Sequence, residues 1–263
     1  MSCPFPPEIL DHIVDHLHDE PAALRTCCTV SKSWVPRTRK HLFTRIEFNA
    51  SKSHMKLWKK TFSDPEDSPA HHTRSLFVCG IPMANVVEEG VGGWIRTFCN
   101  VVCLEFSHLD QASLVPFYGL SPAVSSLRLD YATAEVFDLI CSFPLLEDLT
   151  LVALSPEGDA DGWNAPLMSP KLTGTLSLWM FGRTCFIVRR LLDLPGGVHF
   201  SKIDAMFSDH EAKSVTDLVS KCSDTLEKFS IIYYPLSAFP SVPVAGRYLT
   251  SAHRRRFVWG TFP

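Results

Sequence analysis

Two histidines near the start of the chain have a spacing that could support metal chemistry. His12 and His16 are one helical turn apart, so both imidazoles could reach the same ion. Ile13, however, stands where the zinc-protease motif has its glutamate, and no third ligand is evident. His71-His72 follows Pro69 in a segment with loop character. We therefore expect both histidine pairs on solvated surface and predict no metal site.

Motifs that bind phosphate or activate a nucleophile are missing as well. Gly90-Val91-Gly92-Gly93 is not a dinucleotide-binding loop, because Ile95 occupies the position of the third glycine. The sequence contains neither a Gly-Lys-Ser/Thr phosphate loop nor a Gly-x-Ser-x-Gly nucleophile elbow. We predict that the chain is not an enzyme and needs no cofactor.

Composition limits the class of protein further. Apolar residues make up 46% and charged residues 20% of the 263 residues, as in globular proteins, and the net charge of −3 gives no field that favours nucleic acid. No apolar run reaches the roughly 18 residues of a membrane span, and the N-terminus does not resemble a signal peptide. The nine cysteines form no C-x-x-C pair. These features favour reduced, mostly buried thiols in a protein of the cytoplasm and/or nucleus, without membrane contact.

Helical periodicity dominates the first fifty residues. After Pro6 and Pro7, which suit the start of a helix, apolar residues fall on one stripe and charged residues lie opposite. The stripe consists of Ile9, Leu10, Ile13, Val14 and Leu17. Pro21 opens a second helix that turns four residues inward: Leu24, Cys27, Cys28 and Val30.

A third helix is expected after a short break. Ser31-Lys32-Ser33 interrupts the second helix, and Ser33 can cap a helix that runs from Trp34 to about Phe43. Three helices of this length cannot bury their apolar stripes alone. They therefore need one another and a further partner.

This pattern resembles an F-box. The matching residues are Phe5-Pro6-Pro7-Glu8-Ile9-Leu10, Ile13, Leu17, Leu24, Val30-Ser31-Lys32-Ser33-Trp34 and Leu42-Phe43, with Phe5 where the family usually has leucine. The resemblance implies a three-helix module that docks on a Skp-type adaptor, which in turn binds a cullin. It assigns the adaptor-binding role to Phe5, Pro6, Ile9, Leu10, Ile13, Leu17, Leu24, Val30 and Trp34. The alternative is that residues 5–43 form only a helical cap on the following domain.

The rest of the chain repeats a short triplet in which two apolar residues flank a third residue. The triplets begin at Ile46, Leu76, Leu104, Leu127, Leu149, Leu176, Ile203 and Phe229. Their first residues are 30, 28, 23, 22, 27, 27 and 26 residues apart, and all intervals but the first lie within the roughly 20–29 residues of leucine-rich repeats. Helix-like stretches separate the triplets, most clearly at 132–143 and at 208–222, where Ser208 and Glu211 suit a capping box.

Segments 143–151 and 225–231 also look like the start of the repeats found in F-box proteins. We therefore predict an α/β fold in which a three-helix F-box, residues 1–45, precedes an irregular leucine-rich-repeat-like solenoid. The solenoid spans residues 46–235 and has a curved, mostly parallel sheet, and residues 236–263 form an irregular C-terminal segment. An ordinary α/β domain with similar strand spacing remains the alternative.

Alternation along a strand predicts which side chains could bind a target. If the first and third residues of a triplet enter the core, the second points outward. The outward set is Glu47, Phe77, Glu105, Arg128, Thr150, Ser177, Asp204 and Ser230, with Asp130, Asp148 and Trp179 flanking it. In a leucine-rich repeat this set lines the concave side. Phe77 and Trp179 are the candidate anchors for a target, unless an insertion such as 155–170 covers them.

These expectations combine into an interaction protein rather than an enzyme. The resemblance implies a substrate-recognition adaptor of an SCF-type ubiquitin ligase, with the target bound by the repeats. Ten Lys and Arg residues within 21–60, against Glu47 alone, favour an acidic partner or else form a solvated face. The remaining alternatives are an F-box scaffold without ubiquitination and a small-molecule enzyme with a pocket among the loops.

Overall fold

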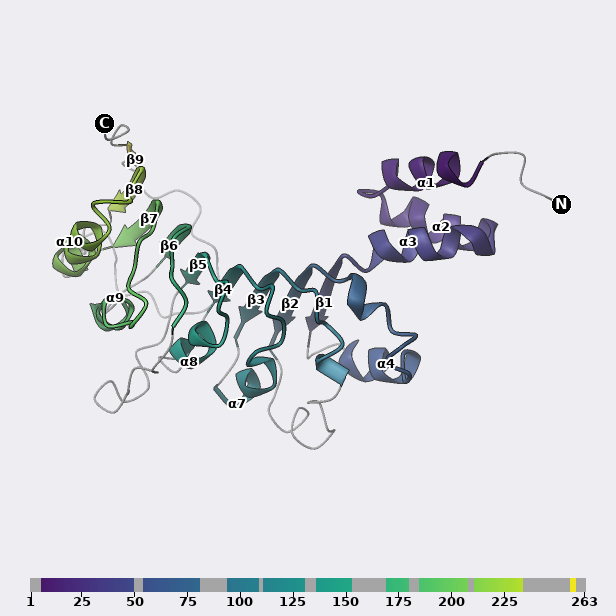
Figure 1. Ribbon diagram of the computed structural model, residues 1–263, viewed down its shortest axis with the longest axis horizontal. Coiled ribbons are helices and arrows are strands. Elements are labelled where there is room, and N and C mark those ends of the chain that lie inside the picture. Colours follow the sequence, from purple (N-terminus) through teal and green to yellow (C-terminus); the bar gives the residue numbers. More distant parts are fainter. Residues whose placement is uncertain are drawn as a thin grey trace, which may run out of the picture.

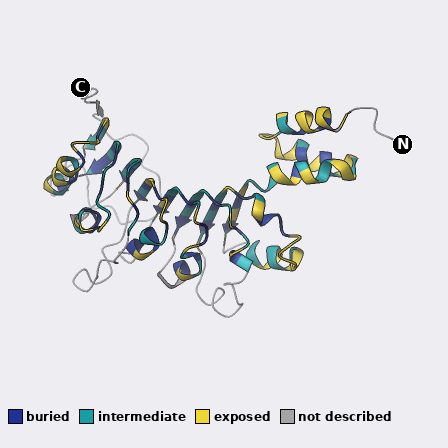
Figure 2. Cartoon of the chain, viewed as in Figure 1, coloured by how far each residue is buried: buried dark blue, intermediate teal, exposed yellow. Residues whose placement is uncertain are grey.

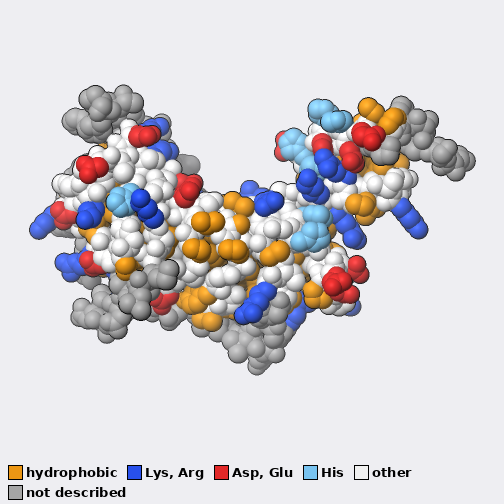
Figure 3. All heavy atoms as spheres, in the orientation of Figure 1, with side chains coloured by type: hydrophobic (Ala, Val, Ile, Leu, Met, Phe, Trp, Pro, Cys, Tyr) orange, Lys and Arg blue, Asp and Glu red, His pale blue; other side chains and the backbone are white. Residues whose placement is uncertain are grey.

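The computed structural model describes residues 6–49, 54–80, 94–108, 111–130, 136–152, 169–179, 185–207, 211–233 and 256–258. The fold is α/β and is built around a single sheet. The strands follow one another along an arc, with helices on its outer side and a group of three helices beyond one end (Figure 1). The space-filling view shows the inner side of the arc as a broad hollow (Figure 3).

All eight triplets expected from the sequence lie on strands. The strands are β1 (Arg45–Asn49), β2 (Ser75–Cys79), β3 (Cys103–Ser107), β4 (Ser126–Asp130), β5 (Asp148–Val152), β6 (Thr175–Trp179), β7 (Lys202–Phe207) and β8 (Lys228–Tyr233). Each strand pairs with the next in parallel and in sequence order. A short strand, β9 (Arg256–Val258), pairs antiparallel with β8, so the C-terminal segment expected to be irregular contains one strand.

The helices fall into two groups. The first consists of α1 (Pro7–His16), α2 (Pro21–Val30), the 3₁₀ helix η1 (Lys32–Trp34) and α3 (Val35–Leu42), and we call residues 7–42 the helical module. The second group lies along the outer side of the arc (Figure 1). It consists of α4 (His54–Thr61), η3 (Pro69–His72), α7 (Gln111–Leu114), η4 (Val115–Phe117), α8 (Val136–Cys141), α9 (Cys185–Leu192) and α10 (Ala212–Lys221).

Helix ends differ from the expected caps. The hydroxyl of Ser31, not of Ser33, accepts the cap bond, from the N–H of Ser33 at 3.3 Å. Helix α3 begins after Trp34 without a side-chain cap, because η1 leads directly into it and Pro36 in its first turn has no N–H to satisfy. Glu211 makes no capping bond to α10 either, and Ser208 lies outside the described residues.

A ladder of backbone hydrogen bonds joins the turns that precede the strands. In most steps one carbonyl oxygen accepts two successive N–H groups of the next turn, at 2.8–3.3 Å. The accepting residues are Thr44, Arg74, Val102, Ser125, Gly174 and Ser201. Because both donors share one acceptor, a slip by one residue would break two bonds, and the ladder therefore fixes where each strand begins against the previous one.

The step between β5 and β6 uses a side chain instead. The N–H of Gly174 reaches the Glu147 carbonyl at 3.2 Å, but the N–H of Thr175 donates to Asp148 Oδ1 at 2.6 Å. A Cβ atom at position 174 would lie 2.5 Å from the same carboxylate oxygen. Glycine is therefore required at 174 for as long as Asp148 takes this position.

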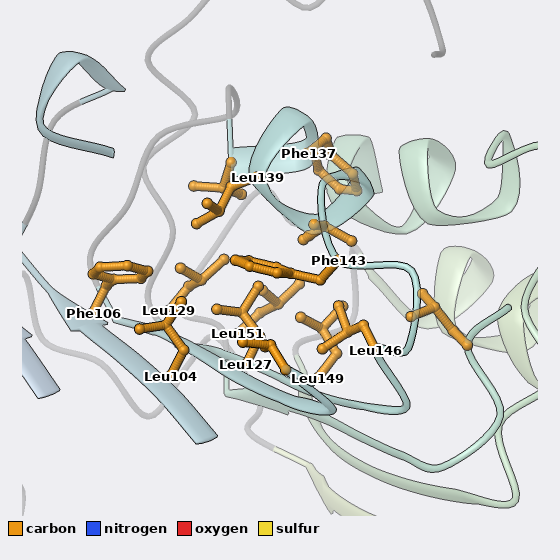
Figure 4. Close-up of a cluster of buried hydrophobic side chains, with 14 of the residues drawn as sticks. Leu104, Phe106, Leu127, Leu129, Phe137, Leu139, Phe143, Leu146, Leu149 and Leu151 are labelled. Atoms are coloured by element: carbon orange, nitrogen blue, oxygen red, sulfur yellow. The ribbon is translucent and has the colours of Figure 1, made fainter. Parts of the chain in front are cut away.

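The hydrophobic core lies between the sheet and the outer helices. The first and third residues of the triplets from β1 to β7 are all buried, as the alternation predicts. Figure 4 shows leucines of β3, β4 and β5 directed at Phe137, Leu139 and Phe143, which come from α8 and the turn after it. Buried positions alternate with positions of mostly intermediate burial along the strands, whereas the helical module exposes much of its surface (Figure 2).

Aromatic rings close the end of this core beside β1, which has no preceding strand to cover it. Phe48 meets the rings of Trp58, Trp94 and Phe98 edge-on, with centroids 5.6–5.9 Å apart. Phe43, the residue after α3, packs against Trp58 at 5.7 Å. The end of the helical module therefore belongs to the same packing cluster as the first strand.

Adjacent leucines test the position of the core. Leu146 is 1% exposed, whereas Leu145 is 60% exposed. We expect Leu146→Ala to lower the free energy of unfolding by about 2–5 kcal/mol, because it leaves a cavity. Leu145→Ala, as the matched control, should change it by less than about 0.5 kcal/mol. Urea unfolding of both variants measures the difference, and equal losses would contradict the described packing.

Candidate interaction surfaces

The helical module is held together by a small core of its own. Leu10 and Val14 of α1 are buried, as are Leu24 and Cys27 of α2. Helix α3 contacts both α1 and α2 and buries Thr38, whose hydroxyl donates to the Trp34 carbonyl at 2.7 Å. The apolar stripes of α1 and α2 are thus only partly covered within the module.

A charged cluster ties α1 to α3. Asp15 Oδ1 accepts a hydrogen bond from Arg37 Nε at 2.6 Å, and Oδ2 accepts a second from Arg37 Nη2. His41 Nε2 lies 2.7 Å from Asp15 Oδ1. The hydrogen bonds from Arg37 and His41 hold the pKa of Asp15 well below its usual range. Helical periodicity had placed Asp15 only on the polar side of α1, since nothing local in sequence links it to residues on α3.

The outer half of the α1 stripe remains exposed. Ile9 is 46% exposed and Ile13 is 43% exposed, and their spacing of four residues places them on one side of the helix. Val30, at the end of α2, is 62% exposed, which corrects the expectation that it points inward. Hydrophobic side chains gather at the outer end of the module (Figure 3).

The other residues expected to bind an adaptor divide by burial. Pro6 is exposed, and Leu17 and Trp34 are half-buried. Leu10 and Leu24 are buried inside the module, so they support the surface rather than form it. Phe5 lies outside the described residues.

Basic residues of the segment 21–60 lie mostly on the surface, as expected. Exposed members are Arg25, Lys32, Arg39, Lys40, Arg45, Lys56 and Lys60; Arg37 and Lys59 are half-buried, and Lys52 lies outside the described residues. Lys40 and Arg39 come close enough to η3 to contribute, after burial and His71, to a lowered pKa of His72. Positive charge therefore extends from the module to its junction with the sheet.

The face of the sheet opposite the helices lies on the inner, hollow side of the arc (Figure 1). We call it the outward face, because its side chains point away from the hydrophobic core, and these side chains form rows across the strands. Strand register aligns the predicted outward residues in one continuous middle row: Glu47, Phe77, Glu105, Arg128, Thr150, Ser177, Asp204 and Ser230. The expectation that Arg128, Thr150 and Ser177 lie on the same side is confirmed. Asp130, Asp148 and Trp179 flank this row on the same face, two residues along their strands.

A second row of the outward face lies two residues beyond the middle row, toward the C-terminal ends of the strands. From β5 to β8 this row is apolar. Val152 aligns with Trp179, which aligns with Met206, which aligns with Ile232. Trp179 is 40% exposed, whereas Met206 is only 5% exposed. Phe77, the other predicted anchor, is half-buried.

Acidic residues on the outward face differ in how they are compensated. Asp130 pairs with Arg128 at 3.1 Å, and Asp204 pairs with Lys202 at 2.9 Å. Asp148 accepts the backbone bond from Thr175. Within the described part of the chain, Glu47 and Glu105 form no ion pair.

Cysteines are less buried than expected. Of the described thiols, only Cys27 and Cys222 are buried, whereas Cys99 is exposed. Cys79 and Cys103 are half-buried because they lie on the outward face, on β2 and β3. Burial and the nearby Glu105 carboxylate raise the pKa of the Cys103 thiol.

Among the described residues, no three His, Cys, Asp or Glu side chains are grouped to hold a metal ion. His12 and His16 are both exposed, as expected. None of the described helices has the length and apolar character needed to cross a membrane.

Comparison with known protein families, curated proteins and solved structures finds no match. Inference about function therefore rests on the helical module and the outward face.

The pH dependence of the module tests the Asp15 cluster. A carboxylate with a depressed folded-state pKa stabilises the folded state above its unfolded pKa of about 3.9, and this contribution is lost as pH falls below that value. We therefore expect Asp15→Asn to lower the melting temperature of the module at pH 7 and to lower it less near pH 2, where part of this contribution is already lost. The NMR amide signals of residues 7–42 can follow melting of the module, because the six tryptophans of the chain would mix the fluorescence of the module with that of the sheet.

Asp11→Asn provides the matched control, because exposed Asp11 lies one turn earlier on α1 and influences Arg37 only through long-range charge. It should lower the melting temperature much less than Asp15→Asn. A loss on Asp15→Asn that is the same at both pH values would show that the carboxylate charge is not what stabilises the module.

Proposed function

We propose that this chain is an F-box protein that acts as a substrate-recognition adaptor of an SCF-type ubiquitin ligase. The helical module binds a Skp-type adaptor and, through it, a cullin. The sheet and its outer helices are a degenerate leucine-rich-repeat solenoid whose outward face binds the target protein. Catalysis belongs to other subunits, and this chain supplies effective concentration and orientation of the target.

One observation carries this proposal: α1 buries Leu10 and Val14 but leaves Ile9 and Ile13 almost half exposed. Single exposed apolar residues are common, but these two share one side of a short helix whose sequence also resembles the start of an F-box. Covering the exposed part of each side chain, a little under half of it, is worth roughly 1 kcal/mol. The surface therefore suits a stable protein partner better than water.

Repetition of the strand units supports the second half of the proposal. Successive strands pair in order, each strand unit packs mainly against its neighbours, and their spacing agrees with leucine-rich repeats in all but the first interval. The outward face lies on the hollow side of the arc (Figure 1). A curved surface of this kind can contact a target across many strands at once.

Truncation of the exposed isoleucines tests adaptor binding. We expect the double variant Ile9→Ala/Ile13→Ala to weaken binding to a purified Skp-type adaptor by about 100-fold or more, because both side chains lose apolar contact area. Isothermal titration calorimetry measures the affinity. Both side chains are substantially exposed in the free chain, so the melting temperature should change little.

Val115→Ala/Leu145→Ala is the matched control, because these side chains are 55% and 60% exposed on the sheet body, outside the module. It should leave adaptor affinity unchanged. If the folded Ile9/Ile13 double variant binds the adaptor as tightly as the unaltered chain, α1 is not the docking surface.

Salt tests the role of the basic surface. If the exposed cations around the module steer an acidic partner, the association rate with the adaptor should fall about tenfold or more between roughly 0.05 M and 0.5 M salt. The dissociation rate should change much less. Arg39→Gln/Lys40→Gln should flatten this dependence, because both side chains are exposed. A salt-independent association rate would show that these residues form a solvated surface and do not steer the partner.

A further inference from the structure

Phe77 differs in character from the rest of its row. It is the apolar member of a middle row whose other residues are charged or carry hydroxyl groups. Its neighbours along β2 on the same face, Ser75 and Cys79, are small. Phe77 is only partly buried, so part of its ring stays accessible on this face.

Carboxylates border the ring on both sides across the sheet. Glu47 on β1 and Glu105 on β3 are both in register with Phe77. Neighbouring strands are about 4.8 Å apart, so the backbones of the two glutamates lie roughly 10 Å apart with the phenyl ring between them. A group resting on the ring is thus within reach of both carboxylates.

These carboxylates lack the compensation found elsewhere on the outward face. Asp130 and Asp204 each have a basic partner on their own strand, and Asp148 has a backbone donor. Arg45 precedes Glu47 by two residues, yet no ion pair joins them. Glu105 accepts a long hydrogen bond from the Cys103 thiol at 3.9 Å, and Arg128, its neighbour in register, pairs with Asp130 instead. Among the described residues, neither Glu47 nor Glu105 is therefore neutralised by an ion pair.

We propose that the target of the outward face presents an arginine or lysine side chain that rests on Phe77 between Glu47 and Glu105. The aromatic face attracts a cation, and the carboxylates supply the opposite charge on either side. An apolar side chain in the same place would desolvate two carboxylates without compensation, and an acidic one would be repelled. This inference rests on the proposed role of the outward face as the target-binding surface, and it specifies a basic target segment.

Short peptides test the chemistry without knowledge of the target. The probes are N-acetylated heptapeptides Gly-Ser-Ala-X-Ala-Ser-Gly in which X is arginine, lysine, citrulline, leucine or glutamate. Each is titrated to about 5 mM into the ¹⁵N-labelled full-length chain, and the amide signals of residues 47, 77 and 105 are followed. Citrulline keeps the shape of arginine but removes its charge, so it isolates the electrostatic contribution.

We expect the arginine and lysine peptides to shift these signals, and the citrulline, leucine and glutamate peptides to leave them unchanged. Raising salt from about 0.05 M to about 0.5 M should weaken the arginine response severalfold. Glu47→Gln/Glu105→Gln should weaken binding about tenfold or more. Phe77→Leu, which keeps an apolar side chain but removes the ring, should weaken it about threefold.

Asp204→Asn is the matched control, because its carboxylate lies in the same row but is already paired with Lys202. It should alter binding less than about twofold. The inference is overturned by equal responses to the arginine and citrulline peptides, by an unchanged response of the Glu47→Gln/Glu105→Gln protein, or by no response to any peptide.

Failure here can be separated from failure of the proposed function. Adaptor binding uses Ile9 and Ile13, which are far along the chain from this surface and are untouched in these variants. If the unaltered chain binds the adaptor but none of the peptides, only the cation site fails. If the cationic peptides bind as expected but the adaptor does not, the site stands and the F-box role fails.

Discussion

Most turns before a strand offer one carbonyl oxygen to two consecutive N–H groups of the next turn, and this shared acceptor sets the register of the parallel strands. The pattern begins at Thr44 and recurs to Ser201, except at one step, where the Asp148 carboxylate replaces a backbone carbonyl as the second acceptor. Side chains alternate along a strand with period two, so a slip of one residue would move every buried leucine to the outward face. The continuous middle row from Glu47 to Ser230 exists because these turns hold the strands in step.

The same hydrogen-bond ladder connects the helical module to the sheet that carries the outward face. Helix α3 ends at Leu42, Phe43 enters the aromatic cluster around Trp58, and the Thr44 carbonyl is the first acceptor of the ladder. Contacts between α3 and η3 add a second attachment. Only two residues separate the helical module from β1, and both are held by packing or hydrogen bonds. Packing and hydrogen bonds therefore fix the orientation of the module relative to β1.

Sequence patterns predicted the strands well because the signal for them is local. The alternation within a triplet such as Leu127-Arg128-Leu129 is enough to predict which residues enter the core. Helix periodicity was less informative about the module, since it shows which residues share a stripe but not which half of the stripe meets a neighbouring helix. This is why Leu10 is internal while Ile9 and Val30 are exposed.

Contacts between distant residues left no such signal. The bond from Arg37 to Asp15 joins two helices and depends on how they pack, and the turn ladder is made by backbone atoms that any sequence carries. Likewise, the sequence predicted which residues lie on the outward face, but it did not predict which of them form ion pairs. Which carboxylates are neutralised, such as Asp204, and which are not, such as Glu105, depends on side-chain geometry.

The step at Asp148 has an evolutionary consequence. Elsewhere the ladder tolerates exchange of side chains, because the backbone supplies both donors and acceptor. Here the Asp148 carboxylate occupies the space that a Cβ at position 174 would need, while it also holds Thr175. Positions 148 and 174 are therefore coupled: a larger residue at 174 requires the Asp148 carboxylate to move or to be lost, and its Cβ would still lie 3.1 Å from the Glu147 backbone. In related chains the two positions should covary, with glycine at 174 present wherever the aspartate is kept.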